Sequence, residues 1–137
     1  MFEIIDRFSL WCKQKISLHA VAAAESQRQK FFKQGEVWWC RIGMNVGDEI
    51  FGKGDAFVRP VFVFKKLTGN TFLGLPITKR EKVGSWYVKF RVDGDDRWVL
   101  LNQARVFDSR RLLGRVGAVS TRDFNIIRGR FVTFYSS

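Results

Sequence analysis

Hydrophobic and polar positions divide this chain into a helical first part and a β-rich remainder. Residues 1–33 contain neither Gly nor Pro and repeat apolar residues near helical spacing. This pattern predicts an amphipathic helix over about residues 2–28, with a break near His19 as an alternative. From Gly35 onward, short runs rich in Val, Phe and Trp are separated by Gly, Asp or Asn, which is typical of strands.

The β-rich part predicts a series of short antiparallel strands. The expected strands are Glu36–Ile42, Val58–Lys66, Thr71–Pro76, Trp86–Val92, Arg97–Leu101 and Ala104–Phe107. Thr68–Asn70 and Asp93–Asp95 fit hairpin turns, because Gly, Asn and Asp tolerate the positive φ that such turns need. Sequential hairpins of this length predict a small antiparallel barrel. A capping-box spacing at Ser120–Asp123 predicts a short C-terminal helix with Phe124, Ile126 and Ile127 on its apolar face.

Composition limits the classes of protein that this chain can be. Its 137 residues suit one domain, and 24 basic against 13 acidic residues give a net charge of +11. With 46% hydrophobic residues, the chain is expected to fold with a basic face that attracts nucleic acid or an anionic membrane surface. No apolar stretch approaches the roughly 20 residues of a membrane span, and no signal-peptide pattern stands at the start, so a cytoplasmic protein is expected. Cys12 and Cys40 indicate neither a disulfide framework nor a zinc site.

The basic residues gather with aromatic residues in one region. Residues 79–115 hold ten Lys or Arg and five Asp or Glu, interleaved with Trp86, Tyr87, Phe90 and Trp98. Basic groups neutralise phosphates and aromatic faces stack on unpaired bases, so the region fits binding of single-stranded nucleic acid. The alternative is that the aromatic residues are core and the charges a solvated surface.

Residues 43–57 form a glycine-rich segment that is too long for an ordinary hairpin loop. Gly47–Gly54 approaches a phosphate-loop pattern, but Gly54 replaces the Ser or Thr, and the chain continues into an extended segment at Arg59-Pro60 instead of a helix. We therefore interpret the segment as a flap over a groove, with a plain surface loop as the alternative.

Few residues in this chain offer catalytic chemistry. His19 is the only histidine, which excludes two-histidine nucleases, Ser-His-Asp hydrolases and His-rich metal sites. Carboxylates cluster at Asp48-Glu49 and at Asp93–Asp96, but acids in turns are commonly solvated, so no metal or other cofactor is expected. Arg59 and Thr78 stand at the ends of apolar strands, where they are either functional groups or ordinary solvated residues.

Several short motifs occur along the chain in a fixed order, and together they are typical of one protein family. They are Gly35–Trp39, Gly43–Glu49, Gly52–Gly54, Arg59–Val61, Pro76–Thr78, Leu101–Arg105, Asp108–Leu112 and Gly117–Phe124. Together they resemble the MazF/PemK-type toxins of type II toxin–antitoxin systems over about residues 34–130. The first part, with Phe8, Trp11, Lys13 and Lys15, is similar to a helical extension found in one branch of that family.

The resemblance implies both a fold and an activity. The expected fold is mainly β with helices: a small SH3-like antiparallel barrel (residues 34–137) with a C-terminal helix, preceded by a helical N-terminal extension (residues 1–33). The implied activity is metal-independent endoribonucleolytic cleavage of single-stranded RNA at short sequences, in which the ribose 2′-OH attacks the adjacent phosphate. The products are a 2′,3′-cyclic phosphate and a 5′-OH. The expected partners are a second copy of the chain and a cognate antitoxin with an acidic C-terminal segment.

The resemblance also implies roles for single residues. Arg59 of the Arg-Pro motif is the expected catalytic residue, Thr78 its partner, and Glu49 a candidate general base. A planar guanidinium suits the charge that gathers on a pentavalent phosphorane. The expected RNA-binding residues are Lys53, Lys79, Arg80, Gln103 and Arg105. Some relatives carry an acid at the position of Asn102, so a mechanism that needs a carboxylate there does not apply to this chain.

Two other functions remain open on the sequence alone. Basic SH3-like barrels often bind nucleic acid without cleaving it, and a DNA-gyrase inhibitor shares this architecture. The first 33 residues either cover an apolar side of the barrel or extend an interface with a second copy or an antitoxin.

Overall fold

The computed structural model describes residues 2–24 and 31–136. The helices are α1 (Phe2–Ala24), η1 (Leu101–Gln103), η2 (Ser109–Arg111) and α2 (Thr121–Ser136). The strands are β1 (Glu36–Arg41), β2 (Val58–Lys66), β3 (Thr71–Thr78), β4 (Tyr87–Val92), β5 (Asp95–Leu100), β6 (Arg105–Asp108) and β7 (Leu112–Ala118). No helix among the described residues is long and apolar enough to cross a membrane.

The strands form a curled antiparallel sheet in the order β4-β5-β3-β2-β1-β7. Strand β3 bends along its length, because its first half pairs with β6 and its last residues, Ile77 and Thr78, pair with β5. This curled sheet with flanking helices confirms the predicted barrel fold. The β4–β5 hairpin turns at Asp93 and Gly94, both at positive φ, as the sequence predicts. The β2–β3 turn also lies at Thr68–Asn70, but none of these three residues has a positive φ, so that part of the prediction is wrong.

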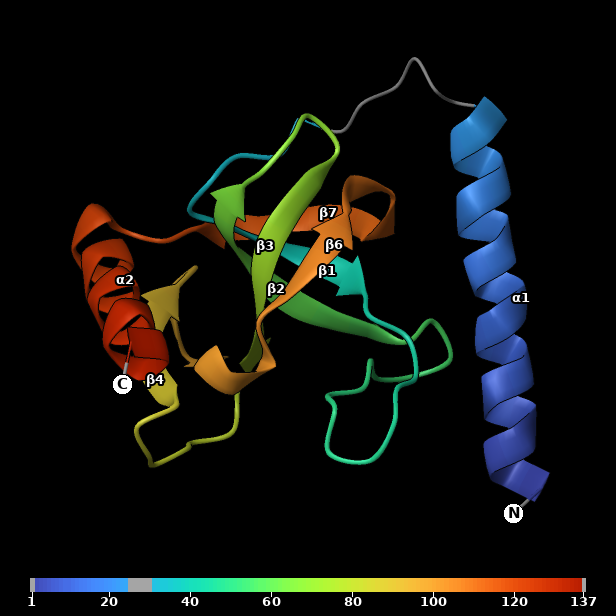
Figure 1. Ribbon diagram of the computed structural model, residues 1–137, viewed down its shortest axis with the longest axis horizontal. Coiled ribbons are helices and arrows are strands. Elements are labelled where there is room, and N and C mark those ends of the chain that lie inside the picture. Colours follow the sequence, from blue (N-terminus) through green and yellow to red (C-terminus); the bar gives the residue numbers. More distant parts are fainter. Residues whose placement is uncertain (1, 25–30, 137) are drawn as a thin grey trace.

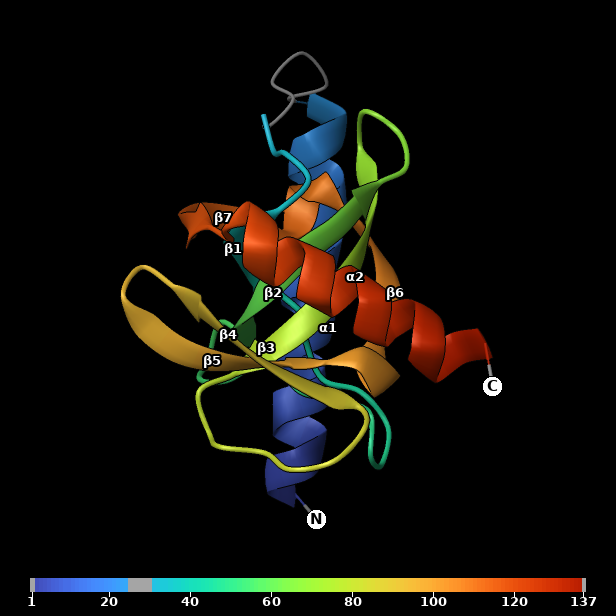
Figure 2. The ribbon, with the colours of Figure 1, turned by 90° about the vertical axis from the view of Figure 1, so that its left-hand side faces the viewer.

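The curled sheet buries a separate apolar cluster on each of its two faces. One cluster includes Phe62, Leu75 and Ile127 and lies under α2, whereas the other includes Cys40, Phe72 and Phe107 and fills the concave side. Figures 1 and 2 show α1 and α2 on opposite sides of the sheet. Residues of β2 serve both clusters in alternation, since Phe62 faces α2 while Val61 and Val63 face the concave side.

Strand β7 is absent from the sequence prediction. Its residues, LLGRVGA, include two glycines and lack a regular alternation of apolar and polar side chains. The segment becomes a strand through its pairing with β1, where two register shifts accommodate the irregular pattern. Tertiary pairing therefore overrides a weak local signal at this edge of the sheet.

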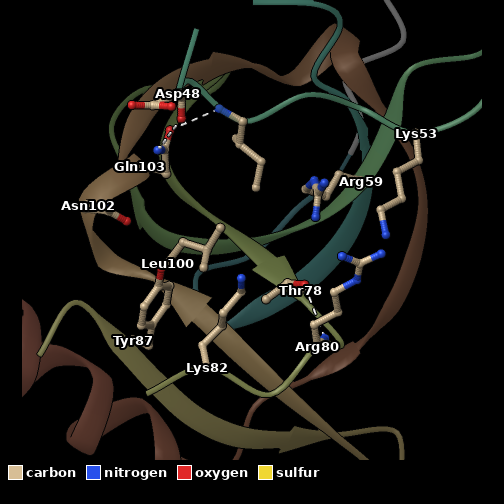
Figure 3. Close-up of a pocket in the computed structure, with 11 residues that line it drawn as sticks. Asp48, Lys53, Arg59, Thr78, Arg80, Lys82, Tyr87, Leu100, Asn102 and Gln103 are labelled. Carbon is tan, nitrogen blue, oxygen red and sulfur yellow. Dashed lines mark hydrogen bonds between the residues drawn. The ribbon is translucent and has the colours of Figure 1, made fainter. Parts of the chain in front are cut away.

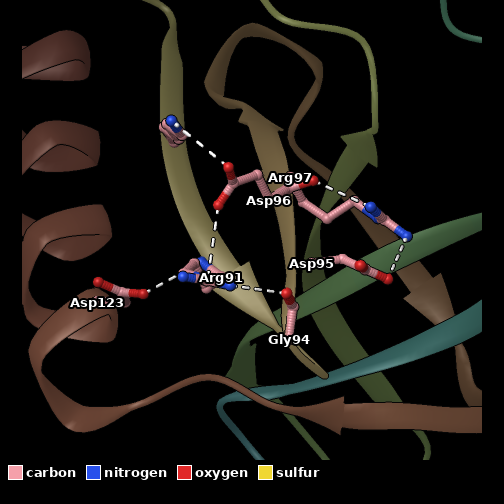
Figure 4. A network of polar contacts seen from close by, with 7 residues as sticks. Arg91, Gly94, Asp95, Asp96, Arg97 and Asp123 are labelled. Carbon is pink, nitrogen blue, oxygen red and sulfur yellow. Dashed lines mark hydrogen bonds and ion pairs between the residues drawn. The ribbon is translucent and has the colours of Figure 1, made fainter.

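The C-terminal helix begins where the capping spacing predicts, but it is longer and uses its polar residues differently. The Ser120 hydroxyl accepts the Asp123 backbone N–H at 3.1 Å. The Asp123 carboxylate does not complete a capping box within the helix and instead accepts the Arg91 backbone N–H at 3.2 Å, which ties α2 to β4 (Figure 4). Ile127 is fully buried, whereas Ile126 is 44% exposed, so its predicted place on the buried face is wrong.

Helix α1 is continuous from Phe2 to Ala24, so it is not broken at His19; the predicted residues 25–28 lie outside the described part of the chain. Its contacts with the barrel centre on Trp11, which is 5% exposed. The indole lies against Phe57 with a centroid separation of 5.7 Å, and it fills the space where a side chain at Gly43 would be. Ile4, Ile5 and Ile16 are exposed, so α1 does not cover a broad apolar side of the barrel. It packs on the loop between β1 and β2 and on η2, where the Arg111 guanidinium lies over the Trp11 ring at 5.7 Å.

Candidate functional site

Arg59 and Thr78 lie at the same end of the β2–β3 hairpin. Strand β2 pairs with β3 so that Val61 is opposite Pro76. Moving two residues outward along each strand reaches Arg59 and Thr78, on the same face of the sheet. Two side chains that are 19 residues apart in the sequence therefore meet where β2 begins and β3 ends, in the middle of the sheet.

Both side chains line a pocket of about 310 Å³ that is open to solvent. Figure 3 shows its walls, which come from the β1–β2 loop, the start of β2, the end of β3, the segment after β3, the start of β4, the end of β5, and η1. The pocket is strongly cationic. The lining residues are Asp48, Ile50, Lys53, Arg59, Thr78, Arg80, Lys82, Tyr87, Leu100, Asn102 and Gln103, with four basic side chains and one acidic side chain.

The Arg59 guanidinium is half-buried and held by the loop above it. Its Nε donates to the Phe51 carbonyl oxygen at 2.8 Å. Burial, and next the nearby charge of Arg80, lowers the pKa of Arg59 from its ordinary value. A guanidinium still keeps its charge at physiological pH, so both terminal nitrogens remain positively charged donors beside the pocket.

Thr78 is 7% exposed and ends β3. Its hydroxyl oxygen accepts the Arg80 backbone N–H at 3.2 Å. Since that bond uses a lone pair on the oxygen, the hydroxyl hydrogen can be donated to a group in the pocket.

The β1–β2 loop is a folded structure with several internal bonds. Gly52 N–H donates to the Gly43 carbonyl at 2.8 Å, and Gly43 N–H donates to the Phe57 carbonyl at 3.1 Å. The Gln103 side chain joins the loop to η1: its amide oxygen accepts the Ile50 N–H at 3.2 Å, and its amide nitrogen donates to the Asp48 carbonyl at 3.1 Å (Figure 3). The loop therefore forms one wall of the pocket.

The predicted site residues fall into three groups. Lys53 and Arg80 line the same pocket as Arg59. Glu49 and Arg105 line a second pocket of about 560 Å³, which shares the Gln103 wall with the first. Lys79 lines neither of these two pockets.

Glu49, the expected general base, lies apart from the first pocket. Its carboxylate accepts the Val46 backbone N–H at 2.7 Å, and it lies in the second pocket rather than beside Arg59. Direct proton transfer in the first pocket would require the loop to rearrange.

Among the charged and aromatic residues that line the first pocket, the sequence assigned no role to Asp48, Lys82 and Tyr87. Lys82 and Tyr87 belong to the basic, aromatic region that the composition indicated, but nothing in the sequence distinguished them from its other members. Asp48 directly precedes Glu49 in an irregular loop. Such a loop has no regular side-chain period, so the sequence could not predict which of the two carboxylates faces the pocket. Within residues 2–24 and 31–136, no three His, Cys, Asp or Glu side chains are grouped to hold a metal ion.

The fold and the pocket define a small antiparallel barrel protein with a cationic site where β2 begins and β3 ends. The sequence of residues 33–134 matches the family model of the PemK-like, MazF-like toxins of type II toxin–antitoxin systems. The chain belongs to this family. No curated protein matches the chain significantly.

Solved structures with the same fold include MazF from Deinococcus radiodurans, with 20% identity and a TM-score of 0.64, covering 79% of this chain and 99% of that one. A MazE–MazF complex from the same organism has 18% identity and a TM-score of 0.59, covering 78% and 97%. A mycobacterial endoribonuclease in complex with its cognate antitoxin has 14% identity and a TM-score of 0.57, covering 75% and 93%.

Proposed function

We propose that this toxin is a metal-independent endoribonuclease that cleaves single-stranded RNA at short sequences. The ribose 2′-OH attacks the adjacent phosphate and leaves a 2′,3′-cyclic phosphate and a 5′-OH end. The observation that carries the proposal is the meeting of Arg59 and Thr78 on the wall of one cationic pocket in a PemK-like, MazF-like toxin. The similarity in fold to the mycobacterial endoribonuclease supports the same activity.

In this proposal Arg59 stabilises the transition state. Attack on the phosphorus gathers negative charge on the non-bridging oxygens, and a donor fixed in advance stabilises that charge at little reorganisation cost. The bond from Arg59 Nε to the Phe51 carbonyl fixes the plane of the guanidinium. The two terminal nitrogens then face the pocket as a fork that matches two phosphate oxygens. This arrangement supplies the positive charge that a metal ion provides in other nucleases.

Thr78 acts beside Arg59 on the same phosphate. Its oxygen accepts the Arg80 N–H, which leaves the hydroxyl hydrogen to be donated to the substrate. A hydrogen bond from this hydroxyl to a non-bridging oxygen, or to the attacking 2′-oxygen, orients the substrate for in-line displacement.

The remaining basic groups bind the RNA backbone. Lys53 and Arg80 neutralise phosphates in the first pocket, and Lys79 and Arg105 extend the positive surface beyond it. Asp48, Ile50, Asn102 and Gln103 line both pockets, so a nucleotide chain that occupies both would contact this shared wall.

The proposed partners are a second copy of the chain and an acidic antitoxin. MazE–MazF complexes among the similar structures support an antitoxin partner. Residues 34–137 carry +8 of the total charge of +11, which attracts an acidic peptide to the same surface as RNA.

An RNA cleavage assay in EDTA tests the proposal. The purified protein should cut a defined single-stranded RNA and yield fragments with 5′-OH ends, and Arg59→Ala should not. Binding of RNA without cleavage by the unaltered protein would favour a nucleic-acid-binding module. Absence of cleavage together with inhibition of DNA supercoiling would favour a gyrase poison.

A further inference from the structure

The proposed cleavage needs a proton donor for the 5′-oxygen that leaves the phosphorus. An alkoxide is a strong base and a poor leaving group, so a positioned acid gives a rate gain of about 100-fold or more. The inference about this donor rests on the proposed function. The candidate donors are side chains that line the first pocket.

Most side chains around Arg59 are unsuited to the task. A carboxylate such as that of Asp48 is an acceptor group, and a guanidinium, as in Arg59 and Arg80, is too weak an acid to donate its proton. His19, the only histidine of the chain, is exposed on α1 and lines neither pocket. The Tyr87 phenol lies on the side of the pocket away from Arg59 (Figure 3). Two ammonium groups remain, those of Lys53 and Lys82.

The backbone of Lys53 is fixed next to the catalytic strand. Lys53 N–H donates to the Val58 carbonyl at 2.7 Å, and Val58 N–H donates back to the Lys53 carbonyl at 3.1 Å. Val58 directly precedes Arg59, so this pair of bonds holds Lys53 beside the arginine. In Figure 3 the Lys53 side chain extends into the pocket, with its ammonium toward the Arg80 guanidinium and on the same side as Arg59.

Lys82 differs from Lys53 in what its ammonium faces. The Lys82 nitrogen lies over the Tyr87 ring at 5.9 Å from the centroid, where the aromatic face stabilises the positive charge. Tyr87 lies on the side of the pocket away from Lys53 (Figure 3). Lys82 is therefore a matched control: the same residue type, in the same pocket, with a different neighbour.

The charges around Lys53 favour release of its proton. Partial desolvation, followed by the like charges of Arg59, Arg80 and Lys79, lowers the pKa of the Lys53 ammonium. The nearby acids do not offset this effect: Asp55 pairs with Arg7 of α1 at 3.8 Å, and Asp48 lies across the pocket. A phosphodiester brings a single negative charge to a pocket that is lined by four basic groups.

We propose that Lys53 is the general acid of the cleavage, donating its Nζ proton to the 5′-oxygen as the P–O5′ bond breaks. The 2′-OH gives its proton to water, and the 2′-oxygen forms the new bond to phosphorus. The 5′-oxygen leaves with the bond electrons and becomes a hydroxyl on taking the Lys53 proton. The neutral amine then regains a proton from the hydronium ion formed in the first step.

A substrate with sulfur in place of the bridging 5′-oxygen separates this role from phosphate binding. A thiolate leaves without protonation, because thiols are far stronger acids than alcohols. Lys53→Met should lose about 100-fold or more on ordinary RNA and only a few-fold on the 5′-thio substrate. Lys82→Met should change both substrates by the same factor. An equal loss on both substrates with Lys53→Met would make Lys53 a phosphate contact and overturn the inference, while the proposed function stands.

A second measurement does not depend on removing the amine. In a Cys12→Ser background, Lys53→Cys alkylated with bromoethylamine places an ammonium of lower pKa at the same site. The basic limb of the pH–rate profile should move to lower pH, and an unchanged limb would contradict the role. If the unaltered protein cleaves neither substrate, the proposed function itself fails.

Discussion

The Nε atom of Arg59 donates a 2.8 Å hydrogen bond to the carbonyl oxygen of Phe51. This bond joins strand β2 to the loop above the pocket, so the proposed catalytic guanidinium is positioned by two different parts of the chain. The orientation of Arg59 therefore depends on the conformation of residues 43–57, and changes in that loop should affect catalysis without direct contact with RNA.

Arg59→Lys should inactivate the toxin although it preserves the charge. A lysine has no Nε–H to bond Phe51 while also presenting two donors to a phosphate. We expect cleavage under single-turnover conditions to fall by about 100-fold or more, with an unchanged melting temperature. Lys79→Arg, which exchanges the same two residue types outside both pockets, is the control and should leave cleavage nearly unchanged. Retention of near-normal cleavage by Arg59→Lys would show that charge alone suffices.

Gln103→Ala should release the loop from η1. Both amide atoms of Gln103 bond the loop backbone, at Ile50 and at Asp48. Without them, the Ile50 amide should exchange hydrogen faster while the β2–β3 hairpin stays protected. Asn102→Ala is the matched control, because no hydrogen bond from its exposed side chain to the loop is present among the described residues. Equal exchange at Ile50 in the two variants would contradict the role of Gln103.

Trp11→Ala should loosen α1 and the loop together. The indole contacts Phe57 and lies under Gly43, and Gln14 and Arg7 of the same helix bond the backbone of Asp55 and Gly54. Hydrogen exchange should rise in both α1 and residues 43–57, because removing a buried aromatic side chain costs packing on both sides.

Ile16→Ala is the control for the effect of Trp11, since Ile16 is 69% exposed on the same helix. Faster exchange in α1 with an unchanged loop would show that the helix does not stabilise the loop.

Glu36 should make stability depend on pH. Although burial alone would raise its pKa, hydrogen bonds from Lys33 N–H, the Trp38 indole and Arg115 outweigh that cost, and the pKa is lowered below its ordinary value of 4.5. A lowered pKa in the folded state stabilises the protein above the unfolded value, and this stabilisation is lost as pH falls through the folded value.

Glu36→Gln measures the same effect. The variant should cost about 1–3 kcal/mol in the free energy of unfolding at pH 7, since three donors lose a charged acceptor. The difference from the unaltered protein should shrink when urea unfolding is repeated below pH 4. A difference that stays constant with pH would exclude a role for the carboxylate charge.

The sequence predicts the strands and hairpin turns well where local signals are strong. The run of Val and Phe in β2 and the Asp93-Gly94 turn are of this kind, because strand preference and positive φ are local properties. Strand β7 and the exposure of Ile126 depend on which elements pack together, so they could not be predicted locally.

The site shows the same division. Arg59 and Thr78 stand at strand ends, and the pairing of two adjacent strands is enough to bring them together. The positions of Glu49 and Asp48 depend on a 15-residue loop held by Gln103 and Phe57, contacts that no spacing rule gives. Lys53 enters the pocket through such a contact as well, which is why its place beside Arg59 becomes evident only in the structure.

The proposed function depends above all on the 2′-OH being the nucleophile in a cleavage assisted by Arg59. A defined RNA incubated with the protein in EDTA, and a matched RNA with a single 2′-deoxy nucleotide before the scissile phosphate, test it by mass spectrometry. We expect a 2′,3′-cyclic phosphate and a 5′-OH from the first RNA and no cut at that position in the second. Cleavage at the 2′-deoxy position, or products with a 5′-phosphate, would contradict this mechanism.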